Sequence, residues 1–178
     1  MLTSAYSRRN FLKTGTVMSG LFVFSNYACA IQAPTRSLAL NNIHTGESLK
    51  LDYWEQGVYI NESIDEINYL LRDHRRDEVH VIDINLIEQL HRLSAITRTN
   101  KSFEVISGYR SPETNEMLRR KSKGVARNSL HIKGKAVDIQ LPGLSMEELK
   151  KAAMSMQSGG VGKYRHFVHI DTGRVRYW

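Results

Sequence analysis

The sequence predicts an α+β domain in which a small, mainly antiparallel sheet carries a metal site and helices from the N-terminal half pack against the sheet. One observation is the alternation of apolar and polar residues at 37–54, 103–107, 136–141 and 167–171, which is typical of strands. A second is the recurrence of apolar residues at helical spacing within 61–73, 83–96 and 145–156. The third is that metal-binding residue types occur in and beside the last two alternating runs.

A hairpin and two helices are expected in the first half of the domain. Residues 37–54 form two alternating runs around a Thr45-Gly46 turn, which predicts the hairpin. Asn61 or Ser63 can cap the first helix, and Asp83 can cap the second. Three histidines in this half are interpreted as solvated or structural residues: His74, His80 and His91.

The second half continues with a strand at 103–107 and two more helices. Ser111 followed by Pro112 predicts a helix start, and Ser145 predicts another. The basic, Gly-containing segment 119–128 lies between these helices and fits either a wall of a substrate groove or a solvated loop. The helices therefore alternate with strands that end near the polar motifs.

Three residues are candidate ligands of a catalytic metal ion: His131, Asp138 and His169. Two imidazoles and one carboxylate form a donor set that suits zinc with one coordination position left open. Asp138 shares a face of its predicted half-buried strand with Ala136, while Val137 and Ile139 point to the other face. Pairing of this strand with the one that holds His169 would bring the ligands together, so the residues predict a zinc hydrolase.

The pattern resembles the zinc D-Ala-D-Ala peptidases and murein endopeptidases, a family of LAS-type metallopeptidases. The matching motifs are Ser129-x-His131, Gly134-x-Ala136-x-Asp138, the late His169 and the preceding segment Ser107-Gly108-Tyr109-Arg110-Ser111. The ending Phe-Val-His-x-Asp-Thr-Gly at 167–173 is similar to the periplasmic murein endopeptidase branch. The resemblance covers roughly residues 35–178 and implies an LAS/hedgehog-like peptidase fold, bound Zn²⁺, and three substrate-binding residues: Arg110, Ser129 and Tyr109.

The general base of the expected reaction is left open by the sequence. The Glu that some members of this family place three residues before the last ligand is absent, and His166 stands there instead. Asp171 is the second candidate, because it shares a strand face with His169. Its other possible role is to orient a metal ligand.

Peptidoglycan is the substrate that the resemblance implies, cleaved at a peptide cross-link or in a stem peptide by metal-activated water. D,D- and L,D-endopeptidase activity, D-Ala-D-Ala carboxypeptidase or dipeptidase activity, and a non-catalytic peptidoglycan-binding module all remain open. A structural metal site in an adaptor is disfavoured because structural zinc usually has four protein ligands.

Residues 1–30 have the form of a twin-arginine signal peptide. Arg8-Arg9 and Lys13 precede an apolar run that ends in Ala28-Cys29-Ala30, which predicts cleavage after Ala30 and leaves residues 31–178 as one zinc peptidase domain without a transmembrane anchor. A lipoprotein anchored at Cys29 is disfavoured because no aliphatic residue precedes the cysteine at the usual place. Cleavage of the signal peptide would remove these three basic residues and take the net charge from +7 to +4. The expected periplasmic location argues against nucleic acid as a partner.

Overall fold

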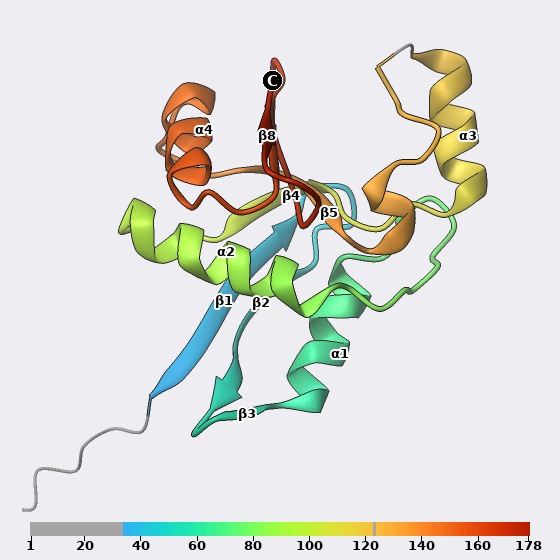
Figure 1. The fold of residues 1–178 in the computed structure, drawn as a ribbon. Coiled ribbons are helices and arrows are strands. Elements are labelled where there is room, and N and C mark those ends of the chain that lie inside the picture. Colours follow the sequence, from blue (N-terminus) through green and yellow to red (C-terminus); the bar gives the residue numbers. More distant parts are fainter. Residues whose placement is uncertain (1–33, 123) are drawn as a thin grey trace, which may run out of the picture. The chain divides into compact units, whose positions relative to one another are not determined.

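The computed structural model describes residues 34–122 and 124–178, and its elements can be followed in Figure 1. The predicted signal peptide at 1–30, including Cys29, lies outside the described residues. Among the described residues, no helix combines the length and apolar character that crossing a membrane requires.

The described chain folds into one eight-stranded sheet with helices, in agreement with the predicted α+β class. The helices are α1 (Asn61–Leu70), α2 (Ile84–Thr97), α3 (Pro112–Lys121) and α4 (Met146–Ser155), with a short 3₁₀ helix η1 (Leu130–Lys133). The strands are β1 (Thr35–Asn42), β2 (Ser48–Glu55), β3 (Val58–Tyr59), β4 (Phe103–Ser107), β5 (Ala136–Gln140), β6 (Gly160–Lys163), β7 (Val168–Asp171) and β8 (Arg176–Tyr177).

The sheet is mainly antiparallel, as predicted. Its strand order is β3-β2-β1-β4-β5-β7-β6-β8, and only the β1–β4 and β6–β8 pairs are parallel. The hairpin predicted from residues 37–54 is the β1–β2 pair. Strands β5 and β7 lie side by side in the interior of the sheet, where each has a neighbour on both edges.

The core lies between the sheet and the helices. Leu86, Ile87, Leu90 and Leu93 of α2 are fully buried, which confirms the predicted apolar face. Helix α4 also contacts the sheet and α2, so a helix of the C-terminal half joins the expected N-terminal ones in covering the sheet. The prediction of a half-buried strand at β5 was also wrong, because Ala136, Val137, Asp138 and Ile139 are all buried. A strand that is central in a covered sheet buries both of its faces.

Three of the predicted helix starts are confirmed, and one is wrong. Asp83, Ser111 and Ser145 cap α2, α3 and α4 by accepting hydrogen bonds from backbone N–H groups of the first turn. At α1 the N-cap is Ile60, without a side-chain bond. The hydroxyl of Ser63 instead donates to the carbonyl of Asp52, 2.8 Å away, so it ties the helix to β2.

Candidate metal centre

The backbone around η1 fixes the position of His131. The Ser129 hydroxyl accepts from the backbone N–H of His131 at 3.3 Å, and Gly134 ends η1 with a left-handed φ of 62°. A Cβ at Gly134 would lie 2.3 Å from the carbonyl oxygen of Val81, so only glycine fits there. The His131 ring is buried, and its Nδ1 lies 2.7 Å from the carbonyl oxygen of Gly108.

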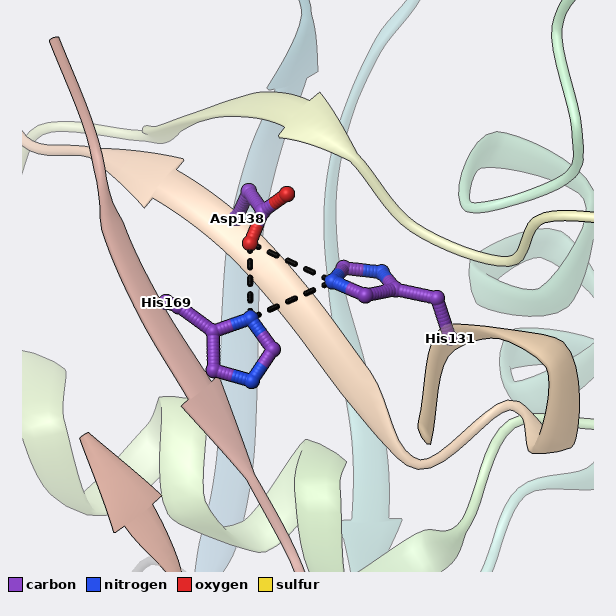
Figure 2. Close-up of side chains that lie close together, drawn as sticks. All are labelled: His131, Asp138 and His169. Carbon is purple, nitrogen blue, oxygen red and sulfur yellow. Dashed lines mark hydrogen bonds and ion pairs between the residues drawn. The ribbon is translucent and has the colours of Figure 1, made fainter. Parts of the chain in front are cut away.

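Asp138 and His169 face each other across two paired strands. They are directly opposite in the antiparallel register of β5 and β7, as the sequence predicts. Figure 2 shows both side chains pointing toward His131, which extends from the neighbouring turn. Nε2 of His131 lies 3.2 Å from Nδ1 of His169 and 3.2 Å from Oδ1 of Asp138, and the last two atoms are 2.8 Å apart.

The hydrogen-bond network leaves three lone pairs at this point. Because Nδ1 of His131 donates to the Gly108 carbonyl, its Nε2 is an acceptor. Nε2 of His169 donates to Oδ2 of Asp171 at 3.0 Å, which leaves Nδ1 of His169 as an acceptor beside the Asp138 carboxylate. With both imidazoles neutral, the three acceptors have no proton between them and repel one another, and a cation removes that repulsion. Ligand atoms of a tetrahedral zinc ion lie about 3.3 Å apart, so these donors fit the metal.

Asp171 is fully buried and bonded on both oxygens. Oδ1 accepts from the backbone N–H groups of Gly160 and Gly173 at 3.0 and 2.8 Å. The guanidinium of Arg176 binds both oxygens, at 3.1 and 2.7 Å, and His169 binds Oδ2. Carboxylates placed in this way behind a metal-binding imidazole set its tautomer and its orientation. Sequence reasoning missed Arg176, although a basic residue so soon after the His-x-Asp pattern was a usable signal.

Arg110 is the cationic neighbour of Asp138. Its Nε donates to the hydroxyl of Ser107 at 2.7 Å, and its NH2 group binds Oδ2 of Asp138, the oxygen that faces away from the two histidines. The side chain of Arg110 is only 13% exposed. Both oxygens of Asp138 are therefore engaged, one at the candidate metal position and one with Arg110.

Charges in the centre shift the pKa values of its groups in opposite directions. Burial alone would raise the pKa of Asp138, but its contacts with His131, His169 and Arg110 hold it well below the usual range. Burial keeps the pKa of His131 below its usual value despite the nearby carboxylate. Burial would also lower the pKa of His169, but the neighbouring carboxylates of Asp138 and Asp171 raise it above the usual value, so metal binding at His169 must displace a proton. Asp138 is thus an anion and His131 a neutral ring at neutral pH, as metal ligands must be.

A cavity of about 540 Å³ opens beside the three residues. Ser129 and Arg110 line it, as do several residues of the basic segment 119–128, which favours a cavity wall over a plain solvated loop for that segment. Its other sides are formed by the aromatic residues Tyr164, Phe167 and Trp178 and by the basic residues His44, Arg75 and Arg176.

Two of the predicted site residues point elsewhere. Tyr109 is buried outside the cavity lining, where its hydroxyl donates to Glu78 at 2.9 Å and its ring stacks on His80. His166 is exposed and does not line the cavity, and its backbone carbonyl accepts from the side chain of Gln140.

An α+β domain with two histidines and an aspartate beside an open cavity belongs to the class of candidate metallohydrolases. A family model described as "Peptidoglycan L,D-endopeptidase MepK" matches residues 30–178. The chain is similar to the peptidoglycan L,D-endopeptidase MepK of Escherichia coli K12, with 43% identity over 176 residues and 97% of each chain covered. It is 38% identical to the probable peptidoglycan L,D-endopeptidase MepK of Haemophilus influenzae over 97% of this chain and 95% of the relative. The chain therefore belongs to the peptidoglycan L,D-endopeptidase MepK family.

Proposed function

We propose that this chain is a zinc-dependent peptidoglycan hydrolase that cleaves L,D cross-links between stem peptides. The observation that carries the proposal is that one ligand atom from each of His131, Asp138 and His169 lies within 4.8 Å of the other two, beside a cavity. The names of the relatives supply the substrate class and the type of bond. We infer that the sheet and this centre together form the LAS/hedgehog-like peptidase fold that the motifs predict.

Zinc held by these three residues would polarise the scissile carbonyl and lower the pKa of a bound water from about 16 to about 7. The protein's own groups would do the rest. Arg110 can donate to a carbonyl or carboxylate of the substrate from the cavity wall, and Ser129 offers a hydroxyl on the same wall. Tyr109 would act indirectly, by fixing the turn that presents Arg110, because its own hydroxyl is bound to Glu78.

The contacts separate the two base candidates. Asp171 touches a candidate ligand, whereas His166 lies outside the cavity lining, which favours Asp171 as the residue that acts on the centre. The carboxylate of Asp171 already accepts from Gly160, Gly173, Arg176 and His169. These contacts favour an orienting role over proton abstraction, so His166→Ala should retain activity, and Asp171→Asn should first weaken metal binding.

Digestion of purified sacculi tests the proposed activity. The expected products, identified by mass spectrometry, are monomers released from diaminopimelate–diaminopimelate cross-links. Treatment with a chelator and the substitution His169→Ala should each abolish release, and added zinc should restore only the chelated wild type. Products that form equally well without metal would contradict the proposal.

A non-catalytic peptidoglycan-binding module is the second candidate. It is favoured by one observation: among the described residues that line the cavity, Asp138 is the only acidic one, and it is a candidate ligand. Zinc-loaded protein that sediments with sacculi but releases no soluble product would support this alternative.

Export to the periplasm is a separate proposal, since it concerns residues 1–30. The family match begins at residue 30, where the signal peptide is expected to end. Replacing Arg8 and Arg9 by lysines should leave an uncleaved precursor in the cytoplasm, because the twin-arginine pathway reads the arginine pair. Sequencing of the mature N-terminus tests cleavage after Ala30.

A further inference from the structure

The wall of the cavity around Arg75 carries a positive charge that no described residue neutralises. Of the three arginines that line the cavity, Arg110 is paired with Asp138 and Arg176 with Asp171. The side chain of Arg75 makes no hydrogen bond or ion pair within residues 34–122 and 124–178, and only its backbone N–H is engaged, with Asp73. Among the described residues, the cavity lining therefore includes one guanidinium with all of its donors available.

The loop that carries Arg75 is fixed from several directions. Asp73, which is 1% exposed, accepts from the backbone N–H of Arg75 at 3.1 Å and from both the backbone N–H and the hydroxyl of Ser111, at 2.9 and 2.7 Å. Asp73 and Glu78 exchange two backbone hydrogen bonds, at 2.9 and 3.3 Å, which close the loop between them. The ring of His74 stacks on His44, a cavity-lining residue, with 4.1 Å between centroids.

A rigid backbone that presents an exposed guanidinium at a cavity is the arrangement expected of a carboxylate-binding group. Arg binds carboxylates with a planar fork of donors, and a preorganised support lowers the entropy lost on binding. The guanidiniums of Arg75 and Arg110 line the same cavity, so their like charges repel each other across it. An anion between them would relieve this repulsion.

We propose that Arg75 is a specificity-determining residue that binds a free carboxylate of the substrate peptide in the cavity beside the His131–Asp138–His169 centre. This inference builds on the proposed function. Among the free carboxylates of a peptidoglycan stem peptide, this inference concerns the two that are not at the C-terminus, one on D-glutamate and one on diaminopimelate, and both present the same chemistry to Arg75. The aromatic wall of Tyr164, Phe167 and Trp178 fits the aliphatic part of the same peptide.

Three cross-linked peptide dimers test the assignment: one with free carboxylates, one amidated on D-glutamate and one amidated on diaminopimelate. Each is digested by the zinc-loaded wild type and by Arg75→Ala and Arg75→Lys variants. Arg76→Ala is the matched control, because Arg76 lies on the same loop but does not line the cavity. Thermal unfolding verifies that the variants are folded, and calorimetry with metal-free protein measures binding of the uncleaved dimers.

On the free dimer, Arg75→Ala should lower kcat/KM on the order of ten- to a hundred-fold, mainly through KM, since the lost contact is a charge-assisted hydrogen bond. One of the two amidations should cost the wild type a similar factor and should leave no further loss in Arg75→Ala. That dimer identifies the carboxylate, and Arg75→Lys should fall between wild type and Arg75→Ala. Arg76→Ala should match the wild type.

The inference is overturned if Arg75→Ala has no effect or loses the same factor on all three dimers. Failure of the proposed function is recognised separately, as a wild type that cleaves none of the dimers. In that case the calorimetric comparison decides, because weaker binding of the free dimer to Arg75→Ala than to wild type supports the inference, and equal binding overturns it.

Discussion

Substitution of Asp171 by asparagine should reverse the tautomer of His169. The backbone N–H groups of Gly160 and Gly173 both point at Oδ1, so the amide oxygen of an asparagine would take that position. Its NH₂ group would then occupy the place of Oδ2 and face Nε2 of His169, from which the wild-type carboxylate accepts a hydrogen bond at 3.0 Å. His169 must therefore move its proton to Nδ1, the atom that faces Asp138 and His131.

The cost of this change appears in metal affinity. Loss of a carboxylate partner behind a metal-binding histidine weakens metal binding by about 10- to 100-fold, or about 1.4–2.8 kcal/mol. Competition with a chromophoric zinc chelator measures the affinity, and hydrolysis of cross-linked dimers at saturating zinc measures the activity. Asp65→Asn, on an exposed position of α1, is the control. A variant that binds zinc as the wild type does but is inactive would refute the orienting role and would identify Asp171 as the general base.

Three further substitutions test the supports of the site. Asp73→Asn should lower the free energy of unfolding by about 1.5–3 kcal/mol near pH 7. Burial would raise the pKa of Asp73, but hydrogen bonds from Thr114, Ser111 and the backbone lower it below 3.8. The stability that the ionised carboxylate contributes is therefore present above about pH 4 and is lost as the pH falls further. Urea unfolding should show a smaller difference in stability between wild type and Asp73→Asn at pH 3 than at pH 7. Ser145→Ala removes a capping box and should cost about 1 kcal/mol without changing activity per folded molecule, whereas an unchanged urea midpoint would contradict the assigned cap. Gly162→Ala would place a Cβ 2.3 Å from the indole of Trp178, so the aromatic wall of the cavity must shift. The KM for cross-linked dimers should therefore rise, and an unchanged KM would show that Trp178 does not contact substrate.

The sequence predicted the centre better than its surroundings, for a physical reason. A period of two places alternate side chains on one face, so the pairing of Asp138 with His169 followed from two short strands. The choice between the two roles offered for Asp171 did not follow, because the donors that surround it come from Gly160, Gly173 and Arg176, which no local pattern connects to it. The direction of Tyr109 was hidden for the same reason, since its partner Glu78 lies on a separate loop.

The fold class followed from periodicity, whereas the strand order depended on contacts distant in sequence. The parallel pairing of β1 with β4 joins strands that are separated by β2, β3 and two helices. Strand β5 is an inner strand because it pairs with β4 on one edge and with β7 on the other, and both of its faces are buried, whereas alternation alone predicted burial of only one face. The missing cap of α1 has a comparable cause, because the hydroxyl of Ser63 has a better partner in β2.

His169 meets Asp138 in only one alignment of β5 against β7. A slip by a single residue would set Val137 or Ile139 in its place and turn the acidic group to the opposite face. An ion bound by residues of both strands would thus favour the native alignment during folding. At a free concentration a hundred times its Kd, the ion would raise the free energy of unfolding by about 2.7 kcal/mol. Zinc supply in the surroundings would then govern how many molecules survive proteolysis as well as how many can act.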